Sequence, residues 1–202
     1  MNISDYIVPI FSEGVFNGTG FIIGSTLITA AHVIESKENV CYFLYGKEEI
    51  SIGSDNNIVF EYPVKESMQG KDNRYWDLAI YKLSNINSPI KLQSPNLSKP
   101  CTYHGYSDVK QIDIYTNIML DNNAYYYPCE YNRKPVRIYN CYFSTVGKSK
   151  AGNSGGPLFQ GDSVIGMLSG DQILCHLSWD RIIKAEYINS CLSKHCNIGN
   201  TK

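Results

Sequence analysis

Short apolar segments rich in β-branched and aromatic residues alternate with polar segments containing Gly, Asn, Ser and Pro along almost the whole chain. Apolar runs of this length, bounded by turn-forming residues, are typical of β-strands. In the first part of the chain the pattern predicts strands at Tyr6–Phe11, Gly20–Ile23, Thr26–Ala30, Val40–Tyr45, Ile50–Ile52, Ile58–Tyr62 and Leu78–Leu83. In the second part it predicts strands at Cys101–Tyr106, Gln111–Met119, Pro135–Ser144, Pro157–Phe159, Ser163–Leu168 and Gln172–Leu177.

Two segments interrupt the strand pattern and divide the chain. Ser84 to Pro100 contains three prolines and is predicted to be the crossover between two sets of strands. Near the carboxyl end, Ser178 can cap a helix whose apolar stripe includes Ile182, Ile183 and Tyr187. We therefore expect an all-β protein with an amino-terminal barrel at 1–90, a carboxyl-terminal barrel at 91–178, and a helix and tail at 179–202.

Composition excludes several classes of protein. The 202 residues are 43% hydrophobic and 18% charged, which is typical of a globular chain, and the net charge of −1 gives no reason to expect a nucleic-acid partner. No segment approaches the roughly 20 apolar residues needed to cross a bilayer. The first residues lack the basic start and apolar run of a signal peptide. We therefore expect a cytoplasmic protein without a membrane partner.

The seven cysteines do not predict a metal site or a disulfide framework. Cys191, His195 and Cys196 cluster near the carboxyl end, but no paired Cys-x-x-Cys spacing supports zinc. Reduced, mostly buried thiols fit a cytoplasmic location. No metal and no cofactor is expected.

The glycine-rich segment 147–159 contains a candidate nucleophile, Ser154, within Gly-Asn-Ser-Gly-Gly-Pro. A serine hydroxyl needs a base to remove its proton and donors to stabilise an oxyanion. The glycines allow a tight bend, so the amides of Gly152 and Ser154, with Asn153 between them, form a candidate oxyanion hole. Taken alone, the segment is equally compatible with a simple hairpin loop.

A histidine and a carboxylate occur in settings that complete this chemistry. His32 follows two apolar strands in Thr29-Ala30-Ala31-His32, and Asp77 stands at the start of an alternating apolar strand in Trp76-Asp77-Leu78-Ala79. The order along the chain is His32, Asp77, Ser154.

These three motifs, in this order, resemble those of the chymotrypsin-like (trypsin-fold) serine proteases, T-A-A-H, D-[LIV]-A and G-[ND]-S-G-G-P, and the resemblance extends from about Val8 to Leu177. It implies two six-stranded antiparallel Greek-key barrels with the active site in the cleft between them. It also implies the roles of the triad: Ser154 attacks a peptide carbonyl, His32 transfers protons and Asp77 orients the imidazole.

The chain departs from the secreted trypsins at several positions. Val33 and Lys150 stand where those relatives commonly have cysteines, and Asn153 replaces an aspartate that the resemblance links to zymogen activation. An asparagine has no charge and cannot form that ion pair, so no activation by amino-terminal trimming is expected. The loop is more similar to that of HtrA-like and other bacterial or viral members.

The resemblance also implies four substrate-binding residues. Lys148, six residues before the serine, corresponds to the floor of the primary pocket, where a lysine would favour acidic side chains unless it points into solvent. Ser169, Gly170 and Asp171 resemble the edge segment that pairs with the substrate backbone.

The sequence thus predicts a serine endopeptidase with a protein or peptide substrate, a narrow range of substrates and a possible regulatory protein partner. The alternative is a catalytically silent peptide-binding module on a protease fold, because a fold alone does not establish function. An α/β-hydrolase esterase is disfavoured, since its histidine comes last along the chain.

Overall fold

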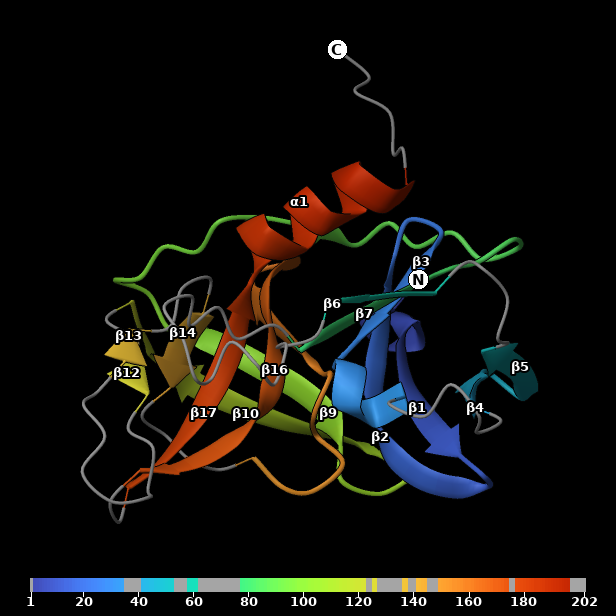
Figure 1. The fold of residues 1–202 in the computed structure, drawn as a ribbon, viewed down its shortest axis with the longest axis horizontal. Coiled ribbons are helices and arrows are strands. Elements are labelled where there is room, and N and C mark those ends of the chain that lie inside the picture. Colours follow the sequence, from blue (N-terminus) through green and yellow to red (C-terminus); the bar gives the residue numbers. More distant parts are fainter. Residues whose placement is uncertain are drawn as a thin grey trace.

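The computed structural model describes residues 2–34, 41–52, 58–61, 77–122, 125–126, 136–137, 141–144, 149–174 and 177–196. Within these residues the chain forms two large sheets and one α-helix, which lies above them in Figure 1. The first sheet contains β1 (Ile7–Ser12), β2 (Val15–Ile23), β3 (Thr26–Thr29), β4 (Cys41–Tyr45), β5 (Glu48–Ile52), β6 (Ile58–Glu61) and β7 (Leu78–Lys82). Its strands are antiparallel, in the order β5-β4-β1-β2-β3-β7-β6. A 3-10 helix, η1 (Ile3–Tyr6), precedes it, and another, η2 (Ala31–Ile34), follows β3.

The second sheet follows the predicted crossover. It contains β8 (Lys91–Leu92), β9 (Cys101–Tyr106), β10 (Ile112–Ile118), β11 (Leu120–Asp121), β14 (Cys141–Ser144), β15 (Pro157–Gln160), β16 (Ser163–Leu174) and β17 (Leu177–Lys184). Seven of them are antiparallel in the order β10-β9-β15-β16-β17-β14-β11, while β8 runs parallel to β16. β12 (Tyr125–Tyr126) and β13 (Val136–Arg137) form a separate pair.

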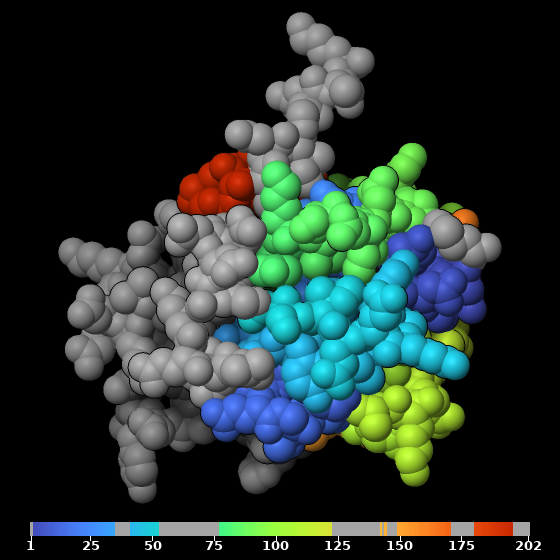
Figure 2. Space-filling view, turned by 90° about the vertical axis from the view of Figure 1, so that its right-hand side faces the viewer, coloured from blue at the N-terminus to red at the C-terminus, as the bar shows by residue number. Residues whose placement is uncertain are grey.

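The predicted all-β class, with two curled sheets and a carboxyl-terminal helix, is confirmed. The two large sheets have seven and eight described strands, whereas the resemblance implies six for each barrel. In the second sheet the two-residue strands β8 and β11 account for the difference. Figure 2 shows the outer side of the first sheet, where the connection after β7 (green) lies above the β4–β5 hairpin (cyan).

The carboxyl-terminal helix begins later than the sequence predicts. α1 spans Ala185–Cys196, and Leu177–Lys184, in which Ser178 was expected to cap the helix, is strand β17 instead. The error has a physical cause, because the side chains of Asp180 to Ile183 are buried on both faces of β17. Ile182 packs into the core of the second sheet and Ile183 into the core shared with the first, so the apolar residues do not alternate with polar ones.

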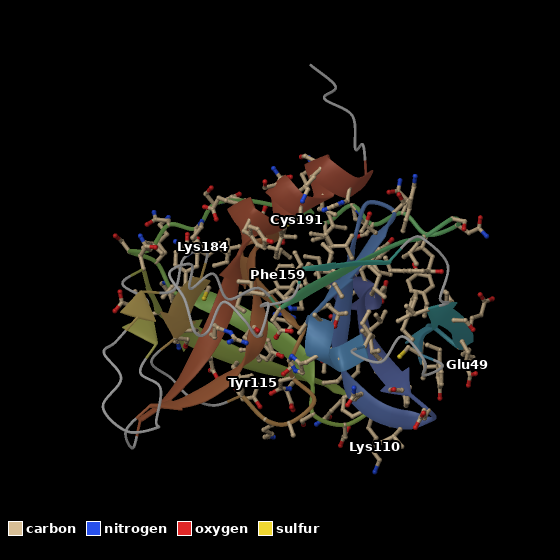
Figure 3. All side chains as sticks on the ribbon, viewed as in Figure 1. Glu49, Lys110, Tyr115, Phe159, Lys184 and Cys191 are labelled. Atoms are coloured by element: carbon tan, nitrogen blue, oxygen red, sulfur yellow. The ribbon has the colours of Figure 1, made fainter. Side chains whose placement is uncertain are left out.

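The larger core joins the two sheets and the helix. Phe21, Ile28 and Phe43 of the first sheet belong to one buried cluster with Phe159 of β15 and Ile188 of α1. Phe159 lies between the two sheets in Figure 3. Apolar burial of this extent stabilises the relative position of the sheets, from which the candidate site residues come. None of the described helices has the length and apolar character needed to span a membrane.

Candidate active site

His32 and Asp77 meet because the strands that carry them are paired. β3 and β7 are antiparallel neighbours with Thr29 opposite Ala79, so η2, after β3, lies beside Asp77, just before β7. Asp77 Oδ2 lies 2.8 Å from His32 Nδ1, and Asp77 Oδ1 accepts the His32 backbone N–H at 3.0 Å. A carboxylate only accepts hydrogen bonds, so Nδ1 carries the proton and Nε2 of the neutral ring has a free lone pair.

The pair is sheltered on the aspartate side and open on the histidine side. The Asp77 side chain is 9% exposed and the His32 side chain 43% exposed. Burial raises the pKa of Asp77, but the hydrogen bond and charge of His32, the charge of Arg181 and the Ser169 hydroxyl together hold it below its ordinary value. Asp77 is therefore a carboxylate that fixes the imidazole, while Nε2 faces the accessible side.

Ser154 lies in a tight turn that bonds to both sheets. The Ser154 carbonyl accepts the N–H of Thr19 on β2 at 2.9 Å, and Gly155 N donates to Leu168 O on β16 at 2.7 Å. Gly155 has φ +86°, and a Cβ atom there would lie 2.0 Å from Thr19 O. Only glycine fits this position, so the turn depends on the glycine that follows the candidate nucleophile.

Two amides of this turn are candidate oxyanion donors. Among the described residues, no hydrogen-bond partner accepts the N–H of Gly152 or Ser154. The amide of Asn153 instead donates to Lys150 O at 3.0 Å, and its buried side-chain Oδ1 accepts the Lys150 N–H at 2.7 Å. Asn153 therefore holds the loop closed through its own backbone neighbours.

Ser169 and Gly170 connect the aspartate to the serine. Ser169 Oγ donates to Asp77 Oδ2 at 2.5 Å, and a Cβ atom built on Gly170 would lie 3.9 Å from Ser154 Oγ. The Ser169 hydroxyl thus contacts Asp77 and Arg181, and the backbone of Ser169 lies in β16. Asp171 follows in the same strand; its side chain and the whole of Lys148 lie outside the described residues.

Arg181 is a site residue that the sequence reasoning missed. It is buried on β17, with Nη2 3.4 Å from Asp77 Oδ2 and 2.5 Å from Ser169 Oγ. The signal in the sequence is the charged pair Asp180-Arg181 directly before Ile182 and Ile183, in a segment whose pattern predicts a helix.

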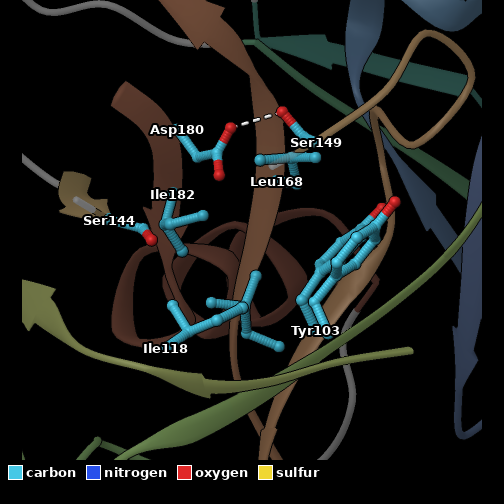
Figure 4. A pocket seen from close by; sticks show the side chains of 9 residues that line it. Tyr103, Ile118, Ser144, Ser149, Leu168, Asp180 and Ile182 are labelled. Carbon is cyan, nitrogen blue, oxygen red and sulfur yellow. Dashed lines mark hydrogen bonds between the residues drawn. The ribbon is translucent and has the colours of Figure 1, made fainter. Parts of the chain in front are cut away.

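A small pocket lies within the second sheet. Its lining comprises Tyr103, Tyr115, Ile118, Ser144, Ser149, Leu158, Leu168, Asp180 and Ile182. Ser149 and Asp180 are hydrogen-bonded across it, as Figure 4 shows. The pocket therefore combines apolar walls with the buried carboxylate of Asp180. Ser149, which also lines the pocket, lies five residues before Ser154 in the sequence.

Comparison with family models identifies the class of protein. The family model described as Trypsin matches residues 2–178, so the chain belongs to the trypsin family. No match is found among the curated proteins.

Solved structures with the same fold include active and inactive proteins. The active form of the Rv3671c protease from M. tuberculosis is 19% identical, with a TM-score of 0.67 over 96% of this chain and 82% of that one. The inactive form is 18% identical, with a TM-score of 0.66 over 96% and 90%. The scabies mite inactivated protease paralogue S-I1 is 14% identical, with a TM-score of 0.64 over 97% and 96%. At these identities the similarity establishes the fold alone.

Proposed function

We propose that the protein is a serine endopeptidase that acts through Ser154, His32 and Asp77. The observation that carries the proposal is the double hydrogen bond between His32 and buried Asp77, which leaves Nε2 as the only basic atom of the ring. The turn that presents Ser154 bonds to the same seam between the sheets.

The chemistry follows from these positions. His32 Nε2 takes the proton of Ser154 Oγ as this oxygen attacks a peptide carbonyl, and the amides of Gly152 and Ser154 stabilise the oxyanion. The imidazolium then protonates the leaving amine, which gives an acyl-enzyme and a new amino terminus. A water molecule, deprotonated by His32, hydrolyses the ester and releases Ser154. Throughout, Asp77 keeps the imidazole oriented and compensates its charge.

We further propose an HtrA-like loop that needs no amino-terminal ion pair. The two hydrogen bonds between Asn153 and Lys150 support this, because they close the loop without a charge at residue 153. A cytoplasmic location, with a protein or peptide substrate and a regulatory protein partner, is part of the same proposal. It is supported by Cys41 and Cys101, which are buried free thiols.

A silent peptide-binding module is the second candidate. Within the part of the chain that the structure describes, no hydrogen bond joins Ser154 Oγ to His32 Nε2. Such bonds are often long before substrate binds, so this geometry is compatible with both candidates. The two differ in whether the serine reacts.

Intact-mass analysis after treatment with a fluorophosphonate distinguishes them. We expect one stoichiometric adduct on the wild-type protein and none on Ser154→Ala or His32→Ala, with peptide hydrolysis reduced by about 10⁵-fold or more in both. Urea denaturation of each variant serves as the control for folding. An unlabelled but folded wild-type protein would refute the endopeptidase and leave the binding module.

A further inference from the structure

Arg181 extends the hydrogen-bonded chain of the candidate triad into the second sheet. Its Nη2 donates to Ser169 Oγ at 2.5 Å, and Ser169 Oγ in turn donates to Asp77 Oδ2. The Arg181 side chain is 7% exposed and its nitrogen lies 3.4 Å from the carboxylate. The cation therefore lies against Asp77 Oδ2, the same oxygen that contacts His32 Nδ1.

The register of β16 and β17 aims this side chain. Gly170 is opposite Arg181 and Leu168 is opposite Ile182, so Ser169 is an extra residue in a bulge. Alternation along β17 then turns Arg181 and Ile183 toward the first sheet, while Asp180 and Ile182 face the pocket in the second. The placement results from the strand geometry and not from a flexible surface side chain.

A fixed cation here changes the proton equilibrium of its neighbours. Protonating His32 creates a second positive charge beside the same carboxylate, so the buried guanidinium opposes it. At the same time the guanidinium compensates Asp77, whose isolated charge would be costly to bury.

We propose, on the basis of the endopeptidase function above, that Arg181 is a positioning residue that orients Asp77 and keeps His32 in its neutral, proton-accepting form at lower pH. Among the described residues, two ionisable groups besides Asp77 bear on this proposal. His32 comes from η2, and Asp180, next to Arg181 on β17, bonds to Ser149 Oγ on the far face. β16 contributes the uncharged Ser169 hydroxyl.

The first experiment follows the protonation of His32 directly. The protein contains four histidines, so ¹³C-labelled histidine gives few signals, and His32→Gln assigns the one of interest. In Arg181→Met we expect the titration midpoint of His32 to lie at higher pH than in wild type, because the variant lacks the cation beside Asp77. In the pH profile of the fluorophosphonate labelling rate, the fall on the acid side should likewise move to higher pH.

Matched variants separate this effect from general damage. Lys110→Met removes a cation from an exposed residue at the periphery of Figure 3 and should leave the midpoint unchanged. Ser169→Ala removes a hydrogen bond to the same Asp77 oxygen without removing a charge, and should move the midpoint less than Arg181→Met.

A charge-balanced pair keeps the proposal testable if Arg181→Met does not fold. Asp77→Asn retains the guanidinium beside His32, and Asp77→Asn/Arg181→Met removes both buried charges. The midpoint should be higher in the double variant than in Asp77→Asn. Equal midpoints in this pair, or in wild type and a folded Arg181→Met, would overturn the proposal.

The two proposals fail in different ways. If the midpoint rises but wild type takes no fluorophosphonate adduct, the endopeptidase is refuted and the effect of Arg181 on His32 stands. If wild type is labelled at Ser154 and the midpoint does not move, the endopeptidase stands and the proposed effect of Arg181 on His32 is refuted.

Discussion

Gly155 shows how much of the candidate site depends on a single missing side chain. Its φ is +86°, and an added Cβ would meet Thr19 O at 2.0 Å and Thr29 Oγ1 at 2.4 Å. Both atoms belong to the first sheet and are themselves joined, because Thr29 Oγ1 donates to Thr19 O at 2.7 Å. The turn can therefore approach the first sheet this closely only if residue 155 is glycine.

Gly155→Ala should destabilise the fold by about 3 kcal/mol or more and abolish fluorophosphonate labelling, because backbone atoms of β2 cannot move aside. Urea denaturation and intact-mass analysis measure the two effects. Gly46→Ala is the matched control, since Gly46 has φ +63° with nothing within 4 Å of an added Cβ. It should cost only about 1 kcal/mol of left-handed backbone strain. Similar losses in both variants would contradict the steric explanation.

At the scale of elements, β2 supports the candidate oxyanion loop from the opposite sheet. Thr19 Oγ1 donates to Gly152 O at 2.9 Å and accepts the N–H of Tyr106 on β9 at 2.8 Å. Its backbone N–H bonds to Ser154 O. One strand thus fixes both ends of the segment that carries the two candidate oxyanion donors.

Thr19→Val should cost about 1–3 kcal/mol, because Gly152 O and Tyr106 N lose their shared partner in a buried position. The rate of fluorophosphonate labelling should fall by at least tenfold as the Gly152 amide loses its fixed direction. Thr26→Val is the control. Thr26 is also buried, but its hydroxyl has no partner in the described part of the chain, so the change should be neutral or stabilising.

The elements differ in how far the sequence predicts them. Most strands of both sheets follow from the apolar pattern, and His32, Asp77 and Ser154 follow from three local motifs. β17 does not, because it is buried on both faces and its sequence pattern matches an amphipathic helix equally well. The same error hid Arg181. Its contact with Asp77 spans 104 residues and depends on the bulge at Ser169, which no local pattern encodes.

At the scale of the whole molecule, the candidate site exists only where the sheets meet. The first sheet supplies His32 and Asp77, and the second supplies Ser154, Ser169 and Arg181. The shared core, with α1 packed over it through Ile188 and Leu192, fixes the seam. Any change that loosens the packing of the sheets should therefore reduce labelling of Ser154 before it unfolds either sheet.

Buried neutral acids within the second sheet make the whole fold sensitive to alkali. Burial raises the pKa of the Cys101 thiol from 9.0 to about 12, and raises the pKa of the Tyr103 phenol well above 10.0. In the unfolded chain both groups ionise near their ordinary values. The unfolded state therefore binds fewer protons than the folded state above about pH 9, and the free energy of unfolding falls as pH rises through this range.

The expected slope is about 1.4 kcal/mol per pH unit for each group, from about pH 9 for Cys101 and from about pH 10 for Tyr103. Urea denaturation under reducing conditions at pH 8, 9, 10 and 11 measures it. Cys101→Ala should flatten the fall between pH 9 and 10, and Tyr103→Phe the fall above pH 10, whatever each change costs at neutral pH. Slopes that match wild type in both variants would show that other groups control alkaline unfolding. A flattened slope in each would show that the buried protons of Cys101 and Tyr103, and not only apolar contacts, stabilise the fold at alkaline pH.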